Sequence, residues 1–248
     1  MLQHCVIVVP VYNEEKRFNQ QEFLQFIAHE PHFSFVFVND GSTDGTAVIL
    51  QDVCRHDARL LYHELPKNSG KGEAVRQGML RAFGVSNAIY VGYLDADLST
   101  PLSELLELVE TLTKDSQLLL AMCARVKLLG RTIDRNPFRH YFGRIFATAV
   151  SIVLRIPVYD TQCGAKIFRS TAAVRDLFRE PFKSRWIFDV EIIARLAQRV
   201  GATKRDMASV LVEYPVRRWR DVRGSKLRFF DFLQAAYELL AIYWKYQH

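Results

Sequence analysis

The first half of the sequence alternates short apolar runs with amphipathic segments of helical periodicity. The apolar runs predict strands at Cys5–Val11, Ser34–Asn39, Arg59–Glu64, Ala88–Leu94 and Leu118–Cys123. The segments between them predict helices at about Gln21–Glu30, Gly45–His56, Gly72–Phe83 and Leu102–Thr113. Strands that alternate with helices form parallel sheets with right-handed crossovers and helices on both faces. The sequence therefore predicts an α/β fold with a mostly parallel central sheet.

The second half predicts fewer strands and longer helices. Its expected elements are a helix at Pro137–Leu154, a strand at Ala165–Phe168, a helix from about Asp189, a strand at Ser209–Tyr214 and a helix at Lys226–Tyr246. No internal repeat and no linker rich in Pro, Gly or Ser interrupts the chain, so we expect one domain over residues 1–248.

Charge favours an anionic partner. The net charge is +6 and the isoelectric point is near 9.2, and basic residues concentrate in 125–144 and 217–228. Clustered arginine suits phosphate groups or a membrane surface, and no basic stripe interleaved with aromatic residues is present to favour nucleic acid. Nucleic acid is therefore not an expected partner.

The cysteines and the apolar segments predict a cytoplasmic protein. Cys5, Cys54, Cys123 and Cys163 are widely spaced, which favours reduced thiols. A strand is expected within a few residues of the N-terminus, so we expect no signal peptide. The most apolar helical stretch, Ile145–Leu154, is too short to span a bilayer, and we expect no membrane-spanning helix.

Two carboxylates spaced i, i+2 directly follow the predicted strand Ala88–Leu94. They are Asp95 and Asp97. Open α/β sheets bind ligands at the carboxyl ends of their strands, where two acids can hold Mg²⁺ or Mn²⁺ beside a diphosphate. The alternative interpretation is a polar turn that caps the helix after Pro101.

Polar residues also follow the first, second and third predicted strands. Asp40 ends the second strand next to Tyr12 and Glu14 of the first, so an aromatic face and acceptor carboxylates suit a nucleoside. Thr43 or Asp44 is expected to cap the following helix. After the third strand, the loop 67–74 reads KNSGKGEA and matches neither the Walker pattern nor the dinucleotide fingerprint. It still offers a lysine at a helix N-terminus, which suits an anion.

Together these motifs resemble the inverting family 2 glycosyltransferases of the GT-A fold. The matching segments, in family order, are Val9–Glu14, Val38–Thr46, Asn68–Gly72 and Asp95–Asp97. Three later segments, Asp160–Phe168, Trp186–Glu191 and Gly224–Leu227, resemble the branch that transfers sugars to polyprenyl phosphates, above all the dolichyl-phosphate β-glucosyltransferases. That branch commonly carries membrane-spanning helices, and its usual Asp-Asp pair is Asn39–Asp40 here.

The resemblance implies roles for residues of the donor site. Pro10, Tyr12, Glu14 and Asp40 would hold the nucleoside with Lys71 nearby, and Asp95 and Asp97 would bind the substrate through Mg²⁺ or Mn²⁺. The metal neutralises charge on the departing nucleoside diphosphate, which makes Asp97 a catalytic candidate. On this interpretation residues 1–125 bind the nucleotide sugar, 126–225 bind the acceptor, and 226–248 form an amphipathic C-terminal helix.

Candidates for the phosphate groups and for catalysis come from the second half. An acceptor phosphate could be clamped by Arg125, Arg131, Arg139 and Arg144, whose alternative is a solvated basic face. Arg223 and Lys226 are candidates for the donor diphosphate, and Gln162 for substrate binding, although Asp160 and Gln162 also fit a turn. Arg139 and Asp189 are, with Asp97, the catalytic candidates. A hydroxyl acceptor requires a base, Asp189 or Glu191, whereas a phosphate acceptor is already anionic.

The function implied is inverting transfer of a hexose from a UDP-sugar, or a GDP-sugar, to a polyprenyl phosphate at the cytoplasmic membrane face. Two alternatives stay open: transfer to a soluble or glycan hydroxyl, and a nucleotide-sugar-binding module without catalysis. A nucleotidyltransferase is least favoured, because the expected glycine-rich N-terminal loop is missing. The C-terminal helix either docks on the core or lies partly in an anionic membrane interface.

Overall fold

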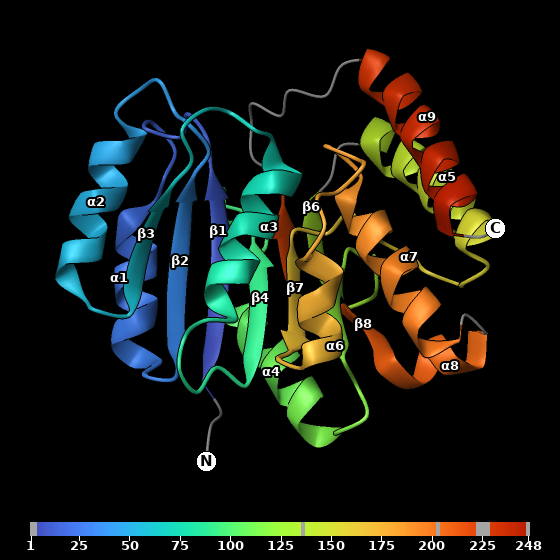
Figure 1. Ribbon diagram of the computed structural model, residues 1–248, viewed down its shortest axis with the longest axis horizontal. Coiled ribbons are helices and arrows are strands. Elements are labelled where there is room, and N and C mark those ends of the chain that lie inside the picture. The colour runs from blue at the N-terminus through green and yellow to red at the C-terminus, as the bar shows by residue number, and fades with distance from the viewer. Residues whose placement is uncertain (1–3, 135–136, 202–203, 222–228, 247–248) are drawn as a thin grey trace.

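A seven-stranded sheet forms the centre of the protein (Figure 1). The computed structural model describes residues 4–134, 137–201, 204–221 and 229–246. The strands are β1 Cys5–Val11, β2 Phe33–Asn39, β3 Leu60–Glu64, β4 Tyr90–Leu94, β5 Leu120–Ala124, β7 Ala165–Arg169 and β8 Leu211–Pro215, in the spatial order β3-β2-β1-β4-β7-β5-β8. A separate parallel pair joins β6 Thr132–Asp134 to β9 Arg218–Arg220. The predicted α/β class is confirmed.

Helices cover both faces of the sheet. One face carries α1 Gln20–His29, α2 Thr46–His56 and α4 Ser103–Lys114; the other carries α3 Lys71–Ala82 and α7 Phe188–Val200. Next to α7, α5 Pro137–Leu154 and α9 Phe229–Tyr246 lie side by side (Figure 1). Shorter elements are α6 Ala172–Arg175, the 3₁₀ helix η1 Asp176–Phe178 and α8 Lys204–Val210.

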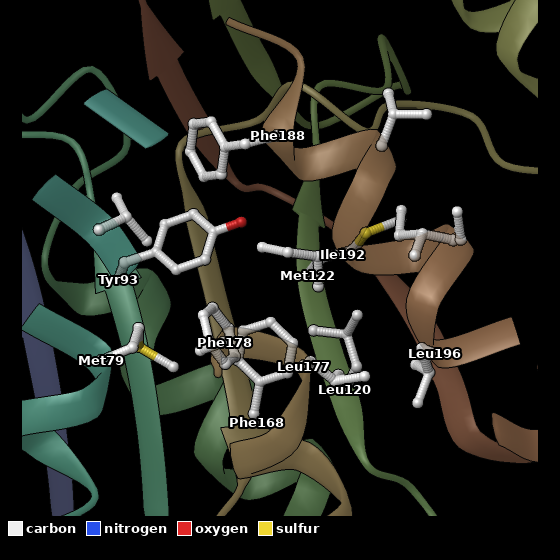
Figure 2. Close-up of a cluster of buried hydrophobic side chains, with 14 of the residues drawn as sticks. Met79, Tyr93, Leu120, Met122, Phe168, Leu177, Phe178, Phe188, Ile192 and Leu196 are labelled. Atoms are coloured by element: carbon white, nitrogen blue, oxygen red, sulfur yellow. The ribbon is translucent and has the colours of Figure 1, made fainter. Parts of the chain in front are cut away.

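The central strands are apolar at nearly every position because both of their faces are buried. Along β1, Val6 and Val8 pack toward α3, whereas Cys5, Ile7 and Val9 pack toward α1 and α4. This continuous apolar character is typical of parallel strands covered on both sides. Figure 2 shows the core on the α3 and α7 side, where aromatic and aliphatic side chains of β4, β5, β7 and α7 meet.

Strand β7 is antiparallel to both of its neighbours, β4 and β5, and is the exception to the parallel pairing within the seven-stranded sheet. The direction follows from its connection. The chain segment before β7 lies at the edge where β4 ends, since Leu94 pairs with Ala165 and Asp95 N–H donates to Gly164 O at 3.0 Å. A strand that starts at this edge must run opposite to β4. As a result, Asp160, Gln162 and Gly164 enter the same edge as Asp95.

The predicted helices and strands agree with the observed bounds to within a few residues, whereas the short elements β6, β9, α6, η1 and α8 were not predicted. The strand predicted at Ser209–Tyr214 begins only at Leu211, because residues up to Val210 continue α8 and Ser209 Oγ donates to Asp206 O. The start of the predicted helix Lys226–Tyr246 lies outside the described residues, and α9 is described from Phe229.

The C-terminal helix is docked on the core and also exposes apolar side chains. Ala235, Leu239 and Ile242 are buried among residues of the main core, whereas Tyr237, Leu240 and Trp244 are more than half exposed. Glu238 is a charged residue on the buried side of α9. It is buried and accepts hydrogen bonds from Ser184 Oγ and Gln234 Nε2.

Candidate active site

The residues predicted for the donor site lie where β1, β2 and β4 end and β7 begins, whereas most of the basic candidates lie elsewhere. Because β1, β2 and β4 are parallel neighbours, their carboxyl ends meet at one edge of the sheet. This is the edge at which open α/β sheets bind ligands. The N-terminus of α3 reaches the same edge through the loop 65–70.

Asn13 joins the loops that follow β1 and β2. It adopts a left-handed backbone conformation with φ of 53°, its N–H donates to Ser42 Oγ, and its Oδ1 accepts the N–H of Thr43. Next to it, Glu14 N–H donates to Thr46 Oγ1 at 2.9 Å. The N-cap of α2 is Gly45 and makes no side-chain cap hydrogen bond, so neither Thr43 nor Asp44 is the cap expected for this helix. Asp44 instead accepts the N–H of Thr46, the first residue of α2, through its Oδ1. These bonds fix the backbone on which the nucleoside candidates stand.

Asp40 holds the loop before α3. Its Oδ1 accepts the Ser69 N–H at 2.7 Å and its Oδ2 accepts the Gly70 N–H at 2.9 Å. Burial raises the pKa of the Asp40 carboxyl, and the two backbone hydrogen bonds oppose that rise. Gly41 allows this close approach because a Cβ there would lie 2.4 Å from Lys67 C. Asp40 therefore ties β2 to the N-terminus of α3.

The other nucleoside candidates lie at the tip of β1. Pro10 and Tyr12 are half-buried. Glu14 is half-buried as well, and its Oε1 lies 2.6 Å from Arg17 Nη2 in an ion pair. These residues share the edge with Asp40, and their contact with a nucleoside stays a prediction.

Lys71 and the two carboxylates after β4 form the charged centre of this edge. Lys71 Nζ lies 2.6 Å from Asp95 Oδ1, with both side chains partly exposed. Burial lowers the pKa of Lys71, but the nearby carboxylates, Asp95 above all, together raise it above its usual value. Asp97 is exposed, and its Oδ1 accepts the Ser99 N–H at 2.9 Å. Its carboxylate also acts electrostatically on Lys71.

The donor set suits a hard divalent cation that is completed by its substrate. The described residues contain no group of three His, Cys, Asp or Glu side chains placed to hold a metal. Two carboxylates plus phosphate oxygens are the usual environment of Mg²⁺ at nucleotide sites. Gly164 shapes this position, since a Cβ there would lie 2.3 Å from Asp95 Oδ2 and displace the carboxylate. Asp95 and Asp97 thus fit a cation that also contacts a diphosphate.

Asp189, a candidate base, is not exposed to solvent. It is buried, accepts hydrogen bonds from Tyr93 Oη at 2.6 Å and Lys166 Nζ at 2.5 Å, and its partner Lys166 is fully buried. Burial and the Asp189 charge raise the pKa of the Tyr93 phenol well above its usual value. Glu191 is also buried and is paired with Arg195 at 2.8 Å. Both base candidates therefore already neutralise a cation of the protein.

Arg125 has an internal partner. Its Nε and Nη2 donate to the two oxygens of Asp160 at 2.6 and 2.7 Å, and its guanidinium lies over the Trp219 ring. A substrate phosphate would have to compete with Asp160 for this arginine. Gln162 is half-buried beside it, and its Nε2 makes no hydrogen bond to any residue that the structure describes.

The remaining basic candidates are spread over several elements. Arg131 lies 5.9 Å from the centre of the Tyr214 ring. Arg144 lies 3.7 Å from the centre of the Tyr159 ring, donates to Tyr159 O and lines an open hollow of about 290 Å³ between α5 and the following loop. Arg139 lies on α5, but its side chain is not among those described. Arg223 and Lys226 lie outside the described residues.

Sequence reasoning missed two cations at this site. Lys166 stands inside the apolar run of β7, and a lysine at a buried strand position signals a need for a buried carboxylate. Arg185 is exposed in the loop before α7, and its Nε lies 3.1 Å from the position of a Cβ on Gly70. No local pattern relates Arg185 to Gly70, because only the tertiary fold brings α7 next to α3.

Comparison with known proteins identifies the family. A family model described as glycosyl transferase family 2 matches residues 6–175. A dolichyl-phosphate beta-glucosyltransferase of Drosophila melanogaster is 35% identical over 97% of this chain and 74% of its own length. The enzymes of that name from Homo sapiens and Saccharomyces cerevisiae are 31% and 29% identical, over 97% and 95% of this chain and 75% and 73% of their own.

A solved structure shares the fold. Glucosyl-3-phosphoglycerate synthase from Mycobacterium tuberculosis, in complex with Mn²⁺, UDP-glucose and phosphoglyceric acid, superposes with a TM-score of 0.65 at 18% identity, covering 97% of this chain and 78% of that one. The likeness confirms the predicted GT-A fold. With the family match over residues 6–175 and relatives above 30% identity along almost the entire chain, this protein belongs to glycosyltransferase family 2.

Proposed function

We propose that the protein transfers a hexose, with glucose favoured, from a nucleoside diphosphate sugar to a polyprenyl phosphate with inversion. The observation that carries this proposal is the meeting of Lys71, Asp95 and Asp97 with the N-terminus of α3 at one edge of the sheet. A lysine, two metal-type carboxylates and a helix N-terminus match the charges of a diphosphate and its cation. The relatives named as dolichyl-phosphate glucosyltransferases support the acceptor class.

The charged residues at this edge would stabilise the negative charge of the departing nucleoside diphosphate. Asp95 and Asp97 would hold Mg²⁺ or Mn²⁺, which supplies charge stabilisation to the leaving diphosphate. The Mn²⁺ and UDP-glucose of the solved glucosyl-3-phosphoglycerate synthase support a divalent cation with a GT-A fold. Tyr12 and Asp40 would face the base and the ribose of the donor.

The buried ion pairs of Asp189 and Glu191 fit a phosphate acceptor better than a hydroxyl acceptor. A hydroxyl must lose its proton to a base as it attacks, and both carboxylates are engaged by Lys166 and Arg195. A phosphate monoester is mostly dianionic at neutral pH, because its second pKa is about 6. It attacks the anomeric carbon without a protein base. Asp189 then acts by positioning its neighbours.

A transfer assay with two acceptor panels tests the proposal. We expect UDP-glucose with Mn²⁺ or Mg²⁺ to glucosylate a short polyprenyl phosphate, and GDP-mannose to be the second donor to examine. The matched control acceptor is the corresponding polyprenol, which lacks the phosphate and should stay unmodified. Transfer to a sugar panel, with none to the polyprenyl phosphate, would replace the lipid acceptor by a glycan hydroxyl. Binding of the donor without any transfer would indicate a nucleotide-sugar-binding module.

A lipid acceptor requires contact with a membrane, and α5 and α9 supply an apolar surface for it. Along the described residues, no helix combines the length and apolar character needed to cross a bilayer. However, exposed apolar side chains repeat at helical spacing on both helices: Tyr141, Ile145 and Ile152 on α5, and Tyr237, Leu240 and Trp244 on α9. Aromatic and aliphatic side chains near a basic segment suit the headgroup region of an anionic leaflet. These side chains support the proposal that the protein binds a membrane peripherally, and the cytoplasmic face is the side that we propose.

We expect reversible, salt-sensitive binding to vesicles that contain an anionic phospholipid. Replacing Tyr237, Leu240 and Trp244 by serine should abolish most of this binding, because it removes apolar area that enters the interface. These three residues lie on the solvent face of α9, so the helix keeps its buried contacts and circular dichroism should be unchanged. The matched control is Val48→Ser, an exposed apolar position on α2. Absence of binding by the intact protein at low salt would contradict the membrane contact.

A further inference from the structure

Lys71 is positioned at one of the two carboxylates assigned to the divalent cation. Its Nζ lies 2.6 Å from Asp95 Oδ1 and 5.9 Å from the centre of the Phe188 ring. A divalent cation that binds Asp95 through Oδ1 would therefore meet an ammonium group in its place. Two cations cannot share one carboxylate oxygen at this distance without strong repulsion.

The neighbouring carboxylates have other partners. Asp189 is neutralised by Lys166 Nζ at 2.5 Å, and Asp97 Oδ1 accepts the Ser99 N–H. Asp95 is thus the carboxylate whose charge Lys71 balances. When a cation takes over Asp95, the Lys71 ammonium needs a new anion.

Such an anion would bind at the N-terminus of α3. Lys71 is the first residue of that helix. Gly70 before it has a φ of 92°, and Arg185 Nε lies 3.1 Å from the position that a Cβ on Gly70 would take. A helix N-terminus and two basic side chains together create a positive potential that attracts phosphate. A lysine has a long flexible stem with a compact charge, so it can move between two partners more easily than arginine.

We propose that the Lys71 ammonium group occupies the place of the divalent cation at Asp95 until a nucleoside diphosphate binds. The side chain of Lys71 then moves, and its ammonium group pairs with the diphosphate instead of Asp95. This inference rests on the donor and metal assignments of the proposed function. It adds to those assignments a coupling between cation binding and nucleotide binding. The cation should bind weakly to the free protein and tightly with the nucleotide, and Lys71 should carry much of that coupling. By linkage, the cation strengthens nucleotide binding by the same factor.

Titration of Mn²⁺, followed by its electron paramagnetic resonance signal with and without UDP, tests the exchange without any turnover. We expect Lys71→Met to bind free Mn²⁺ at least about tenfold more tightly than the natural protein, because the competing ammonium is gone. We also expect UDP to increase the Mn²⁺ affinity of this variant by a smaller factor. Lys71→Arg keeps a charge that can pair with Asp95, so its affinity for free Mn²⁺ should stay weak.

Lys67→Met is the matched control, since it removes one positive charge from the same loop at an exposed position. Its binding of free Mn²⁺ should equal that of the natural protein, and thermal melts should show all three variants folded. Equal affinity of Lys71→Met and the natural protein for free Mn²⁺ overturns the exchange while leaving the metal site in place. If the natural protein binds no Mn²⁺ even with UDP, the metal assignment fails and the exchange fails with it.

Discussion

Asp97→Asn is expected to lower the transfer rate by roughly 100-fold or more while leaving the fold intact. The substitution removes one of the two negative charges that would hold the divalent cation beside the donor diphosphate, and loss of preorganised charge stabilisation costs on this scale. Asp97 is exposed, and asparagine can still accept the Ser99 N–H through its side-chain oxygen. The measurement is kcat with saturating Mn²⁺ and UDP-glucose, together with a thermal melt.

Asp115 offers a matched control for this substitution. It is exposed, and its Oδ1 accepts the N–H of Gln117 two residues later at 2.9 Å, which is the same local arrangement as Asp97 with Ser99. Asp115 is the C-cap of α4, whereas Asp97 precedes the N-terminus of the same helix, so Asp115 lies away from the charged edge. Asp115→Asn should therefore keep full activity. Near-normal turnover by Asp97→Asn would show that Asp97 is not a metal ligand and that its carboxylate only caps the turn.

The parts of the fold that depend on local pattern could be predicted from the sequence. The apolar runs that became β1, β2 and β4 are buried on both faces, so their composition alone identifies parallel central strands. Asp95 follows such a strand, and the rule that parallel strands end at one edge brings it near Asp40 without further information. The antiparallel direction of β7 depends on how the chain returns from α5, which no local pattern records.

The partners of the site residues could not be predicted, because they come from distant segments. Asp189 is 23 residues from Lys166 and 96 from Tyr93, and both meet it only when α7 packs against β4 and β7. The charge of Arg125 suggests an acceptor phosphate as its partner, whereas the structure pairs it with Asp160, 35 residues away. Charge patterns show which residues need a partner. Only the packed fold shows which partner they have.

The buried Lys166 is expected to contribute strongly to the free energy of unfolding through its pair with Asp189. Its side chain is fully buried in β7, donates to Cys163 O at 2.8 Å and Asp189 Oδ1 at 2.5 Å, and lies 5.3 Å from the centre of the Tyr93 ring. We expect Lys166→Met to destabilise the protein by about 3–5 kcal/mol, because it leaves the buried Asp189 charge without its cation. Urea unfolding followed by circular dichroism measures the loss.

The cause of that loss can be separated from a simple loss of packing. Methionine nearly fills the volume of the lysine stem, so a packing defect alone should cost less than about 1.5 kcal/mol. Adding Asp189→Asn removes the stranded charge and keeps an acceptor for Tyr93 Oη, so the double variant should be more stable than Lys166→Met alone. Lys127→Met, at an exposed position, should change stability by no more than about 0.5 kcal/mol. If the double variant is no more stable than Lys166→Met, the ion pair is not the origin of the loss. Asp189 would then be free to serve as the base that a hydroxyl acceptor requires.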